Sequence, residues 1–357
     1  MKNKIDMKRY GMSESFARSA EDFMGLTVSR IISQQKGIYR LVSERGEKSG
    51  EVCGKFHYEA KKLSEYPAVG DFVMADWNEG GGNAVIRHIL DRRSCFIRKA
   101  AGAARQEQVV AANIDTVFLC MSLNRDFNLR RMERYLSIAW ESGAVPVIVL
   151  TKSDLCADTQ GRLSEVSCVA AGADILVTGA VEQNGCEQLY KYITNGKTVA
   201  FIGSSGVGKS TLINCLLGEE RLCTGGLRND DKGRHTTTHR ELILLPGGGM
   251  VIDTPGMREL GMWDSGEGID RTFSDIEALA LKCHFRDCSH SGEPGCAVQE
   301  SIENGELSAD RLSSYRKLKN EDMYSQDAED YLARKKQKFK SIAKINKNNH
   351  KQQRGRT

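Results

Sequence analysis

A glycine-rich segment ending in a lysine and two hydroxyl residues carries the clearest chemistry in this sequence. It matches G-x-x-x-x-G-K-[ST] and lies between the apolar run TVAFI and the apolar-patterned stretch STLINCLLG. Glycines let a backbone wrap around phosphates and aim N–H groups at them, and a helix start adds its positive dipole end. The segment comprises Gly203, Ser204, Ser205, Gly206, Val207, Gly208, Lys209, Ser210 and Thr211. We expect Lys209 to reach the β- and γ-phosphates of a nucleotide and Ser210 to bind Mg²⁺.

Two polar segments downstream could complete a site for magnesium and the γ-phosphate. Asp253-Thr254-Pro255-Gly256 follows the apolar run GMVI, so the Asp253 carboxylate can hold the Mg²⁺ shell while the Gly256 N–H approaches the γ-phosphate. The segment GRHTTT lies between the two motifs and reads as a switch loop in which a threonine, Thr237, joins the Mg²⁺ ligands. A solvated threonine-rich loop is the alternative for this segment.

A base-recognition element precedes the phosphate loop. Thr151, Lys152, Ser153 and Asp154 follow the apolar run VPVIVL and match [NT]KxD, with Thr in place of the usual Asn. The Asp154 carboxylate can accept hydrogen bonds from the ring N–H and the exocyclic amine of guanine, which adenine cannot supply. This element argues against the rival interpretation, a P-loop kinase or ATPase. The companion guanine loop matches poorly, because Thr178-Gly179 stands where Ser-Ala is expected.

The residue that orients the attacking water is not obvious from the sequence. Many GTPases place a Gln just after D-x-x-G, but Met257 follows here, and an apolar side chain cannot orient water. We therefore expect slow intrinsic hydrolysis that a docked partner completes. His235 is the candidate within the chain, and the alternative is a neutral switch-loop histidine that contacts RNA.

Three cysteines and a histidine fall in one 14-residue window with the spacing C-x4-C-x-H-x5-C. Cys283, Cys288, His290 and Cys296 offer three thiolates and one imidazole, enough for a closed tetrahedral Zn²⁺ site. Full protein ligation leaves no open position, so we expect a structural role. His284 is the competing imidazole, and free structural cysteines are the alternative.

The elements that must position these motifs alternate between strand and helix after about residue 105. Near-continuous apolar runs predict buried parallel strands at 114–121, 145–150, 174–178, 198–203 and 249–254. Helix-compatible stretches lie at 128–142, 161–171, 185–194 and 209–217. This alternation predicts a doubly wound α/β domain. Because the TKSD element comes before the phosphate loop, we expect a circularly permuted order.

The regions on either side of this domain have different hydrophobic patterns. Short β-like runs (LTVSRII, GIYRLV, EVCGKF, DFVMADW and NAVIRHIL) lie before about residue 97, with turns at 46–50, 70 and 80–82. They predict a small all-β barrel or sandwich, either a nucleic-acid-binding barrel or a β domain of unspecified role. From about Ile269 onward the chain reads as helical and polar.

The charge of the chain is unevenly placed. The 357 residues carry a formal net charge of +4, but ten Lys or Arg and no Asp or Glu lie between Arg334 and Arg356. Removing those ten positive charges from +4 leaves −6 on the rest of the chain. A basic run of this kind releases counterions from nucleic-acid phosphates, so we expect the tail to contact RNA. A solvated solubility tail is the alternative.

Cysteine usage and hydropathy bear on location. The eleven cysteines are odd in number and occupy apolar positions such as Cys120 and Cys215, so they do not indicate a disulfide framework. The amino terminus lacks the apolar run of a secretory signal. The longest apolar stretch, 144–150, is far shorter than the roughly 20 residues that cross a bilayer. We expect a reducing, cytoplasmic location and no membrane partner.

Together these features resemble the circularly permuted GTPases of the bacterial small-ribosomal-subunit biogenesis family, known as RsgA, YjeQ or YloQ. The resemblance covers nearly the whole chain, through the order TKSD, GSSGVGKST, GRHTTT, DTPG and the cysteine–histidine spacing. It implies a multidomain chain: an N-terminal OB-fold β-barrel, a central circularly permuted α/β P-loop GTPase and a C-terminal helical zinc-binding domain. It also implies GTP binding by 151–154 and 203–211 and zinc binding by the Cys283 cluster.

The expected organisation follows from the motifs and the resemblance. We expect an extension (1–25), an RNA-binding OB-fold (26–98), the GTPase (105–262), the zinc-binding helices (263–333) and the basic tail (334–357). The implied function is GTP hydrolysis in late maturation of the 30S subunit, stimulated by the ribosome. The expected partners are 16S rRNA, GTP and GDP, with Mg²⁺ and one structural Zn²⁺, for a monomer. The alternative is a GTP-regulated RNA-binding assembly factor that acts by occupancy, with hydrolysis incidental.

Overall fold

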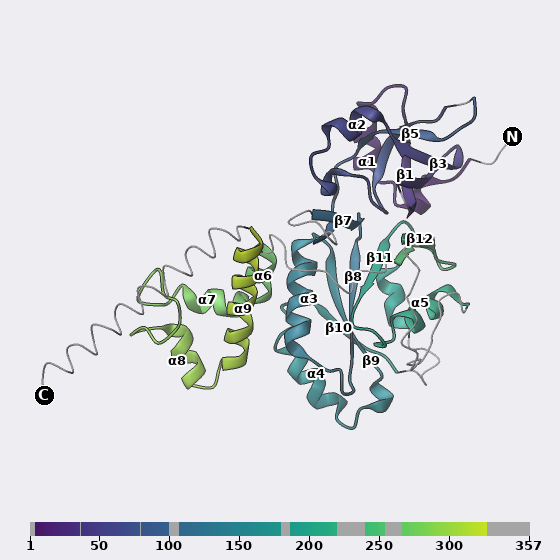
Figure 1. Ribbon diagram of the computed structural model, residues 1–357. Helices are drawn as coiled ribbons and strands as arrows, with labels where there is room; N and C mark the ends of the chain where they lie inside the picture. Colours follow the sequence, from purple (N-terminus) through teal and green to yellow (C-terminus); the bar gives the residue numbers. More distant parts are fainter. Residues whose placement is uncertain are drawn as a thin grey trace, which may run out of the picture.

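Three bodies make up the computed structural model, which describes residues 4–35, 37–78, 80–99, 107–179, 186–219, 240–253 and 266–326. A β-barrel lies at one end of a central α/β sheet, and a group of C-terminal helices packs beside helix α3 on one face of that sheet (Figure 1). This arrangement confirms the expected fold class of a barrel, a permuted P-loop sheet and a helical C-terminal region.

The barrel consists of five short strands. They are β1 (Thr27–Gln35), β2 (Ile38–Ser43), β3 (Gly46–Val52), β4 (Phe72–Asp76) and β5 (Ala84–Ile89). Their order is β1-β2-β3-β5-β4, and β4 pairs back onto β1, which closes the barrel. The β3–β5 pair is parallel and the other pairs are antiparallel. A closed five-stranded barrel with this order is an OB-fold, which decides between the barrel and the sandwich.

The third barrel strand corrects one sequence expectation. Residues 46–50 were expected to form a turn and 51–56 a strand, but β3 covers Gly46–Val52 and helix α2 (Gly54–Glu59) follows it. Gly50 faces the barrel interior, where a Cβ atom would lie 2.7 Å from Leu41 Cδ1. The glycine at this position therefore allows close packing across the strands and does not mark a turn.

Residues 4–25 pack onto the barrel. They form η1 (Met7–Tyr10) and α1 (Glu14–Glu21), and Ser13 caps α1 by accepting a hydrogen bond from the Phe16 N–H at 3.4 Å. The buried Phe16 ring lies 4.3 Å from the ring of Phe72 in β4, centroid to centroid. A short 3₁₀ helix, η2 (Leu63–Glu65), lies between α2 and β4.

The central sheet has six strands in the order β10-β9-β8-β11-β13-β12. They are β8 (Thr116–Ser122), β9 (Val145–Thr151), β10 (Asp174–Val177), β11 (Thr198–Ile202), β12 (Arg240–Leu244) and β13 (Met250–Asp253). All neighbours are parallel except β12 and β13. The chain begins at the centre with β8, runs outward to β10, and returns to the centre at β11. Strand β9, which ends in the TKSD element, thus precedes β11, which leads into the phosphate loop, and this is the expected circularly permuted order.

Helices cover both faces of the sheet. On one face lies α3 (Leu129–Glu141), whose Met132 and Leu136 are buried, and on the other lies α5 (Lys209–Leu217). The remaining elements are α4 (Thr159–Ser167), η3 (Ser153–Leu155) and η4 (Glu187–Tyr192). The helix expected at 185–194 is thus a short 3₁₀ segment. Strands β8, β9 and β11 send alternate residues into the two cores, which explains their near-continuous apolar sequences.

The barrel and the sheet meet at a joint that the sequence did not indicate. Strand β12 pairs with β1, with Ser33 opposite Glu241 and Gln34 opposite Arg240, so one continuous sheet runs through both bodies. A two-stranded ribbon of β6 (Cys95–Lys99) and β7 (Glu107–Ala112) lies between them in sequence. Neither β12 nor the ribbon was expected.

A fully buried arginine lies at this joint. The guanidinium of Arg30 in β1 donates to neutral acceptors: Tyr10 O at 2.6 Å, Thr198 Oγ1 at 2.8 Å, Gly70 O at 3.2 Å, Asn113 O at 3.3 Å and Met250 Sδ at 3.3 Å. Burial lowers the pKa of Arg30 to about 10, so the group remains charged near neutral pH. Because Thr198 and Met250 begin β11 and β13, one side chain ties the barrel to two strands of the central sheet.

The C-terminal helices dock on α3 through ion pairs. They are α6 (Gly266–Thr272), α7 (Ser274–Ala280), α8 (Ala297–Glu303) and α9 (Ala309–Gln326). The fully buried Glu133 of α3 accepts from Arg311 of α9 at 2.9 Å, and Arg311 also donates to Asp275 of α7 at 2.6 Å. Arg134 of α3 pairs with Glu321 at 2.7 Å. Charged side chains from both sides therefore meet at this joint, beside apolar residues such as Ile269.

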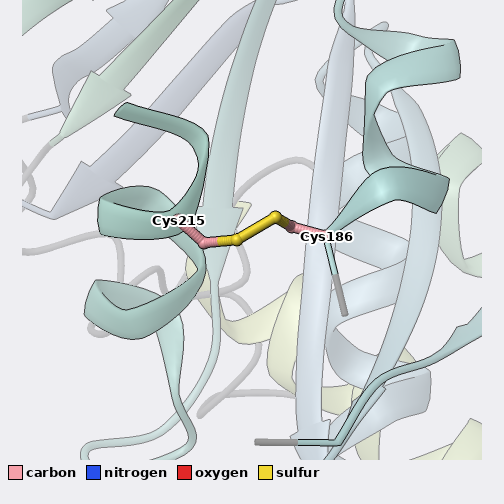
Figure 2. Close-up of a disulfide and its surroundings, with 2 residues drawn as sticks. All are labelled: Cys186 and Cys215. Atoms are coloured by element: carbon pink, nitrogen blue, oxygen red, sulfur yellow. A yellow bond between two sulfur atoms is a disulfide. The ribbon is translucent and has the colours of Figure 1, made fainter. Parts of the chain in front are cut away.

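One cysteine pair departs from the expectation drawn from cysteine usage. Cys186 and Cys215 form a disulfide between the residue preceding η4 and helix α5 (Figure 2). The other eight cysteines of the described ranges are free. A single cross-link does not make a disulfide framework, but it shows that these two positions are not thiols in the structure. None of the helices in the described ranges has the length and apolar character that crossing a bilayer requires.

Candidate functional site

The phosphate loop follows β11, the strand at which the chain returns to the centre of the sheet and begins to add strands on the other side of β8. Strand β11 lies between β8 and β13, and residues 203–208 connect it to α5, as the motif predicts. Ligands of open α/β sheets bind at such points, beyond the carboxyl ends of the strands. A Cβ at Gly203 would lie 2.6 Å from the Cys120 carbonyl oxygen, and Gly208 has φ of +107°. Both positions therefore need glycine, the first for close approach and the second for its backbone angle.

The Lys209 ammonium lies across the loop. Lys209 is the first residue of α5, and its Nζ donates to the carbonyl oxygens of Gly203 at 2.7 Å and Ser204 at 2.5 Å. The cation is thereby held within the loop, at the positive end of the helix dipole. Ser210 follows in the first turn and is half-buried, whereas Ser205, Gly206 and Thr211 are exposed.

The TKSD element is hydrogen-bonded to the phosphate loop. Thr151 ends β9 and is buried, and its hydroxyl donates to the Val207 carbonyl at 2.6 Å. Lys152 adopts a left-handed backbone with φ of +59°, and its Nζ donates to the Gly206 carbonyl at 2.7 Å. The threonine that replaces the usual Asn therefore joins the two motifs, and the two elements lie at one edge of the sheet.

Asp154 faces the poorly matched companion loop. The Ser153 N–H donates to the Thr178 carbonyl at 3.2 Å, which brings the end of β10 against η3. A Cβ at Gly179 would lie 2.9 Å from Ser153 Oγ and 3.4 Å from Asp154 Oδ1. Glycine at 179 leaves room for the Asp154 side chain, which is exposed at this edge. Residues 180–185 lie outside the described ranges.

Asp126 belongs to this site, and sequence reasoning missed it. It lies in the connection between β8 and α3, accepts a hydrogen bond from Ser204 Oγ of the phosphate loop and pairs with Arg131 Nη1 at 2.8 Å. Partial burial acts to raise the pKa of Asp126, but the hydrogen bonds from Ser204 and Arg131 and the nearby positive charges lower it overall. The available signal was a carboxylate shortly after a buried central strand.

The remaining predicted residues are only partly described. Asp253 is half-buried and ends β13, next to β11, so it lies at the same edge as Ser210. His235, Thr237 and Gly256 lie outside the described residues, as do Met257 and the basic tail at 334–357.

The four predicted zinc ligands converge. One ligand atom from each of Cys283, Cys288, His290 and Cys296 lies within 4.8 Å of the other three. The Sγ atoms of Cys283 and Cys296 are 4.0 Å apart, and they lie 3.6 and 3.5 Å from His290 Nδ1. A tetrahedron with Zn–S of about 2.3 Å and Zn–N of about 2.0 Å has edges of about 3.5 to 3.8 Å. The donor set therefore fits a tetrahedral metal ion.

The backbone around the cluster selects His290 over His284. His290 is buried with φ of +57°, and its carbonyl accepts hydrogen bonds from Gln299 and Arg316. The His284 ring instead contacts the Phe285 ring edge-on, with centroids 4.7 Å apart, outside the cluster. Burial lowers the pKa of His290, with a further contribution from the Arg316 charge, which favours the neutral imidazole that metal ligation requires.

Comparison with known proteins gives a consistent result. The family model for the RsgA GTPase matches residues 89–263. The small ribosomal subunit biogenesis GTPase RsgA 2 of Lactiplantibacillus plantarum is 48% identical over 322 residues, which cover 90% of each chain. The corresponding RsgA of Opitutus terrae is 44% identical over 333 residues, covering 90% of this chain and 91% of that one.

Two solved structures share the fold. The crystal structure of YjeQ from Thermotoga maritima superposes with a TM-score of 0.61 at 28% identity, covering 82% of this chain and 97% of that one. The structure of YloQ, described as a circularly permuted GTPase, gives a TM-score of 0.56 at 25% identity, with coverage of 86% and 96%.

Proposed function

This chain belongs to the RsgA GTPase family, and from that membership we propose that it hydrolyses GTP to GDP and phosphate during late maturation of the 30S ribosomal subunit. The observation that carries the proposal is the pair of hydrogen bonds from Thr151 and Lys152 to the phosphate loop. They hold a guanine-type motif and a phosphate-type motif at one edge of the sheet, as binding of a single GTP requires. The names of the relatives support the ribosomal role.

Different residues of the proposed nucleotide site would bind the guanine base, the phosphates and the magnesium ion. The exposed Asp154 carboxylate would accept hydrogen bonds from guanine, while residues 203–211 and Gly256 would hold the phosphates. Ser210, Thr237 and Asp253 are the proposed magnesium ligands. Asp253 ends β13, and Ser210 lies in the first turn of α5, which follows the neighbouring parallel strand β11, so both fit this role. Mg²⁺ bound there would neutralise charge on the phosphates. His235 is the proposed residue for orienting the attacking water.

The Cys283, Cys288, His290 and Cys296 cluster is the proposed site of one structural Zn²⁺. Because all four ligands come from the protein, the ion would stabilise the turns between α7 and α8 and leave no position for a substrate. The distances among the donor atoms support this assignment.

The proposed division of the chain follows from these sites. It comprises an extension at 1–25, an RNA-binding barrel at 26–98, the GTPase at 105–262, zinc-binding helices at 263–333 and a basic tail at 334–357. The barrel and the tail are proposed to contact 16S rRNA within the 30S subunit. The protein would act as a cytoplasmic monomer without a membrane partner.

The test is GTP turnover by the zinc-loaded chain with and without purified 30S subunits. We expect stimulation by 30S, and near-complete loss of turnover in Lys209→Ala because the phosphates lose their cation. Lys197→Ala is the matched control, since Lys197 lies at the opposite end of β11 and pairs with Asp115 at 2.7 Å. Turnover that ignores 30S subunits would contradict the proposal.

The histidine assignment and the alternative function need their own variant. His235→Ala should keep GTP affinity and lose most of the stimulated turnover. If a variant that binds GTP but cannot hydrolyse it still supports 30S maturation in cells, the protein acts by occupancy, and hydrolysis is incidental.

A further inference from the structure

A cavity lies at the joint between the barrel and the central sheet, outside the proposed nucleotide site. It has a volume of about 290 Å³ and is bounded by η1 and α1, by strands β1 and β4, and by the turn 195–197 that precedes β11. A second cavity of about 410 Å³ adjoins it, and the two share Arg93, Ile114, Asp115 and Lys197 in their linings. Together they have the size of a small-molecule site.

The cavity and the phosphate loop lie at opposite ends of β11. Lys197 and Thr198 line the cavity at the start of the strand, whereas Gly203 follows its other end. The strand between them, Thr198–Ile202, spans roughly 13 Å. A ligand in this cavity would therefore occupy a second site, distinct from the one that we propose for GTP.

The lining of the cavity has an excess of positive charge. Its charged side chains are Lys8, Arg30, Arg93 and Lys197, with Asp115 as the carboxylate. Asp115 is already engaged, because it accepts from Lys197 Nζ at 2.7 Å and from the Thr198 N–H at 2.9 Å. Arg30 is 1% exposed and donates to neutral acceptors, so no carboxylate is bound to it. A buried cation of this kind favours an anion in the space beside it.

Lys8 and Arg93 supply donors on the exposed side of the cavity. Neither side chain has a carboxylate partner among the residues that the structure describes. The Arg93 guanidinium lies over the Phe16 ring, with Cζ 4.2 Å from the ring centroid, and its Nη2 donates to the hydroxyls of Ser13 and Ser15. These contacts fix the guanidinium plane and leave Nε and Nη1 for a ligand. A guanidinium held in this way suits binding of a phosphate group through two hydrogen bonds.

The remainder of the lining indicates which class of anion fits. Apolar side chains line both cavities: Met12, Phe16, Phe72 and Ile114 in the first, with Val145 and Tyr192 in the second. Inorganic phosphate would leave this apolar surface unused, whereas an organic group can cover it. A phosphate monoester carries close to two negative charges at neutral pH, and each phosphate of an RNA strand carries one. The excess of cations therefore favours a monoester.

We propose that this cavity binds a small organic phosphate monoester. Its phosphate would lie between Lys8, Arg93 and Lys197, and its organic group would extend into the adjoining cavity beside Val145 and Tyr192. Because the lining comes from η1, from the barrel and from the start of β11, the bound ligand would hold the barrel to the sheet.

The test is calorimetric titration of the zinc-loaded full chain with AMP and with glucose 6-phosphate. GDP and Mg²⁺ are present in excess to fill the proposed nucleotide site. Adenosine and inorganic phosphate are the reference compounds, because each is one half of AMP. The variants are Lys8→Met and Arg93→Met, which each remove one cation from the lining. Arg9→Met is the matched control, since Arg9 is the exposed neighbour of Lys8 and lines neither cavity.

We expect at least one monoester to bind with a dissociation constant below about 1 mM, inorganic phosphate to bind more weakly and adenosine not to bind. Lys8→Met and Arg93→Met should each weaken binding about tenfold, because a charge-assisted hydrogen bond is lost, while Arg9→Met should change it less than about twofold. Hydrogen exchange at 8–12 and 195–198 should slow when the ligand binds.

Failure of both monoesters to bind would overturn the proposal. Equal affinities in the three variants would also overturn it, because binding would then lie elsewhere. Tighter binding of a hexanucleotide RNA without a terminal phosphate, lost in Lys8→Met and Arg93→Met, would replace the monoester by an RNA strand and overturn the proposed ligand class.

Discussion

The central sheet is joined to its two neighbours by different chemistry. At the barrel, one buried arginine, Arg30, donates to three backbone carbonyls, a hydroxyl and a thioether. At the C-terminal helices, the buried Glu133 pairs with Arg311, and Arg311 pairs with Asp275. The difference lies in what can be changed by mutation. Carboxylate partners are side chains and can be replaced together with their arginine, whereas backbone carbonyls remain whatever residue replaces Arg30.

The largest expected effect comes from removing the proposed zinc ion of the Cys283, Cys288, His290 and Cys296 cluster. Structural zinc contributes on the order of 10 kcal/mol to the folding of small metal domains, so chelation or Cys288→Ser should unfold residues 283–303. Hydrogen exchange should show loss of protection there and full protection in β1 and β2 of the barrel. Cys168→Ser, at an exposed free cysteine, is the control. Retained protection of α8 after zinc loss would show that packing alone holds these helices.

Arg30→Met tests the barrel joint. Four oxygen acceptors would lose the donor that they share at this buried position, so we expect the free energy of unfolding to fall by about 3 to 5 kcal/mol. Urea denaturation of the full chain measures this loss. Arg40→Met is the matched control, because Arg40 is an exposed β2 residue paired with Glu47 and should cost less than about 0.5 kcal/mol. A small loss in Arg30→Met would mean that the strand pairing of β1 with β12 alone holds the joint.

Glu133→Gln tests the C-terminal joint. The change removes one of the two carboxylate charges that pair with the buried Arg311, and we expect the free energy of unfolding to fall by about 2 to 4 kcal/mol. A double variant, Glu133→Leu with Arg311→Met, distinguishes the two joints further. It should recover much of the lost free energy of unfolding, because apolar groups can replace a buried ion pair. No corresponding rescue exists for Arg30. A double variant as unstable as the single one would remove the distinction between the joints.

The smallest effect is expected for Arg134→Ala at the rim of the same joint. Arg134 and Glu321 are partly exposed, at 29% and 35% of their side-chain surfaces, so the pair should contribute less than about 1 kcal/mol. Repeating the urea titration at 1 M salt should remove most of the difference, since charges are then screened beyond about 3 Å. An effect of the same size at low and high salt would assign it to lost packing of the arginine stem.

Features that are encoded in a short stretch of sequence could be predicted, whereas features that depend on contacts between distant residues could not. The phosphate loop, the TKSD element and the cysteine–histidine spacing are patterns within short stretches of sequence. In the structure the first two are hydrogen-bonded to each other, and the four residues of the third lie together. Asp126, Arg30 and the Cys186–Cys215 pair depend on contacts between residues that are 20 to 220 positions apart, so no local pattern marks them. The turn predicted at 46–50 was wrong for another reason. Glycine occurs both in turns and where strands pack closely, and only the facing Leu41 side chain shows that Gly50 is of the second kind.

The pairing of β12 with β1 affects how soluble the GTPase region would be without the barrel. In the strand order, β12 would be the outermost strand of the central sheet if the barrel were absent. An open strand presents unpaired N–H and C=O groups on which another chain can add a strand. The opposite margin, β10, is only four residues long. The barrel therefore covers the start of this edge, at Arg240 and Glu241, and a fragment that begins at the GTPase region exposes backbone groups there that pair with β1 in the whole chain.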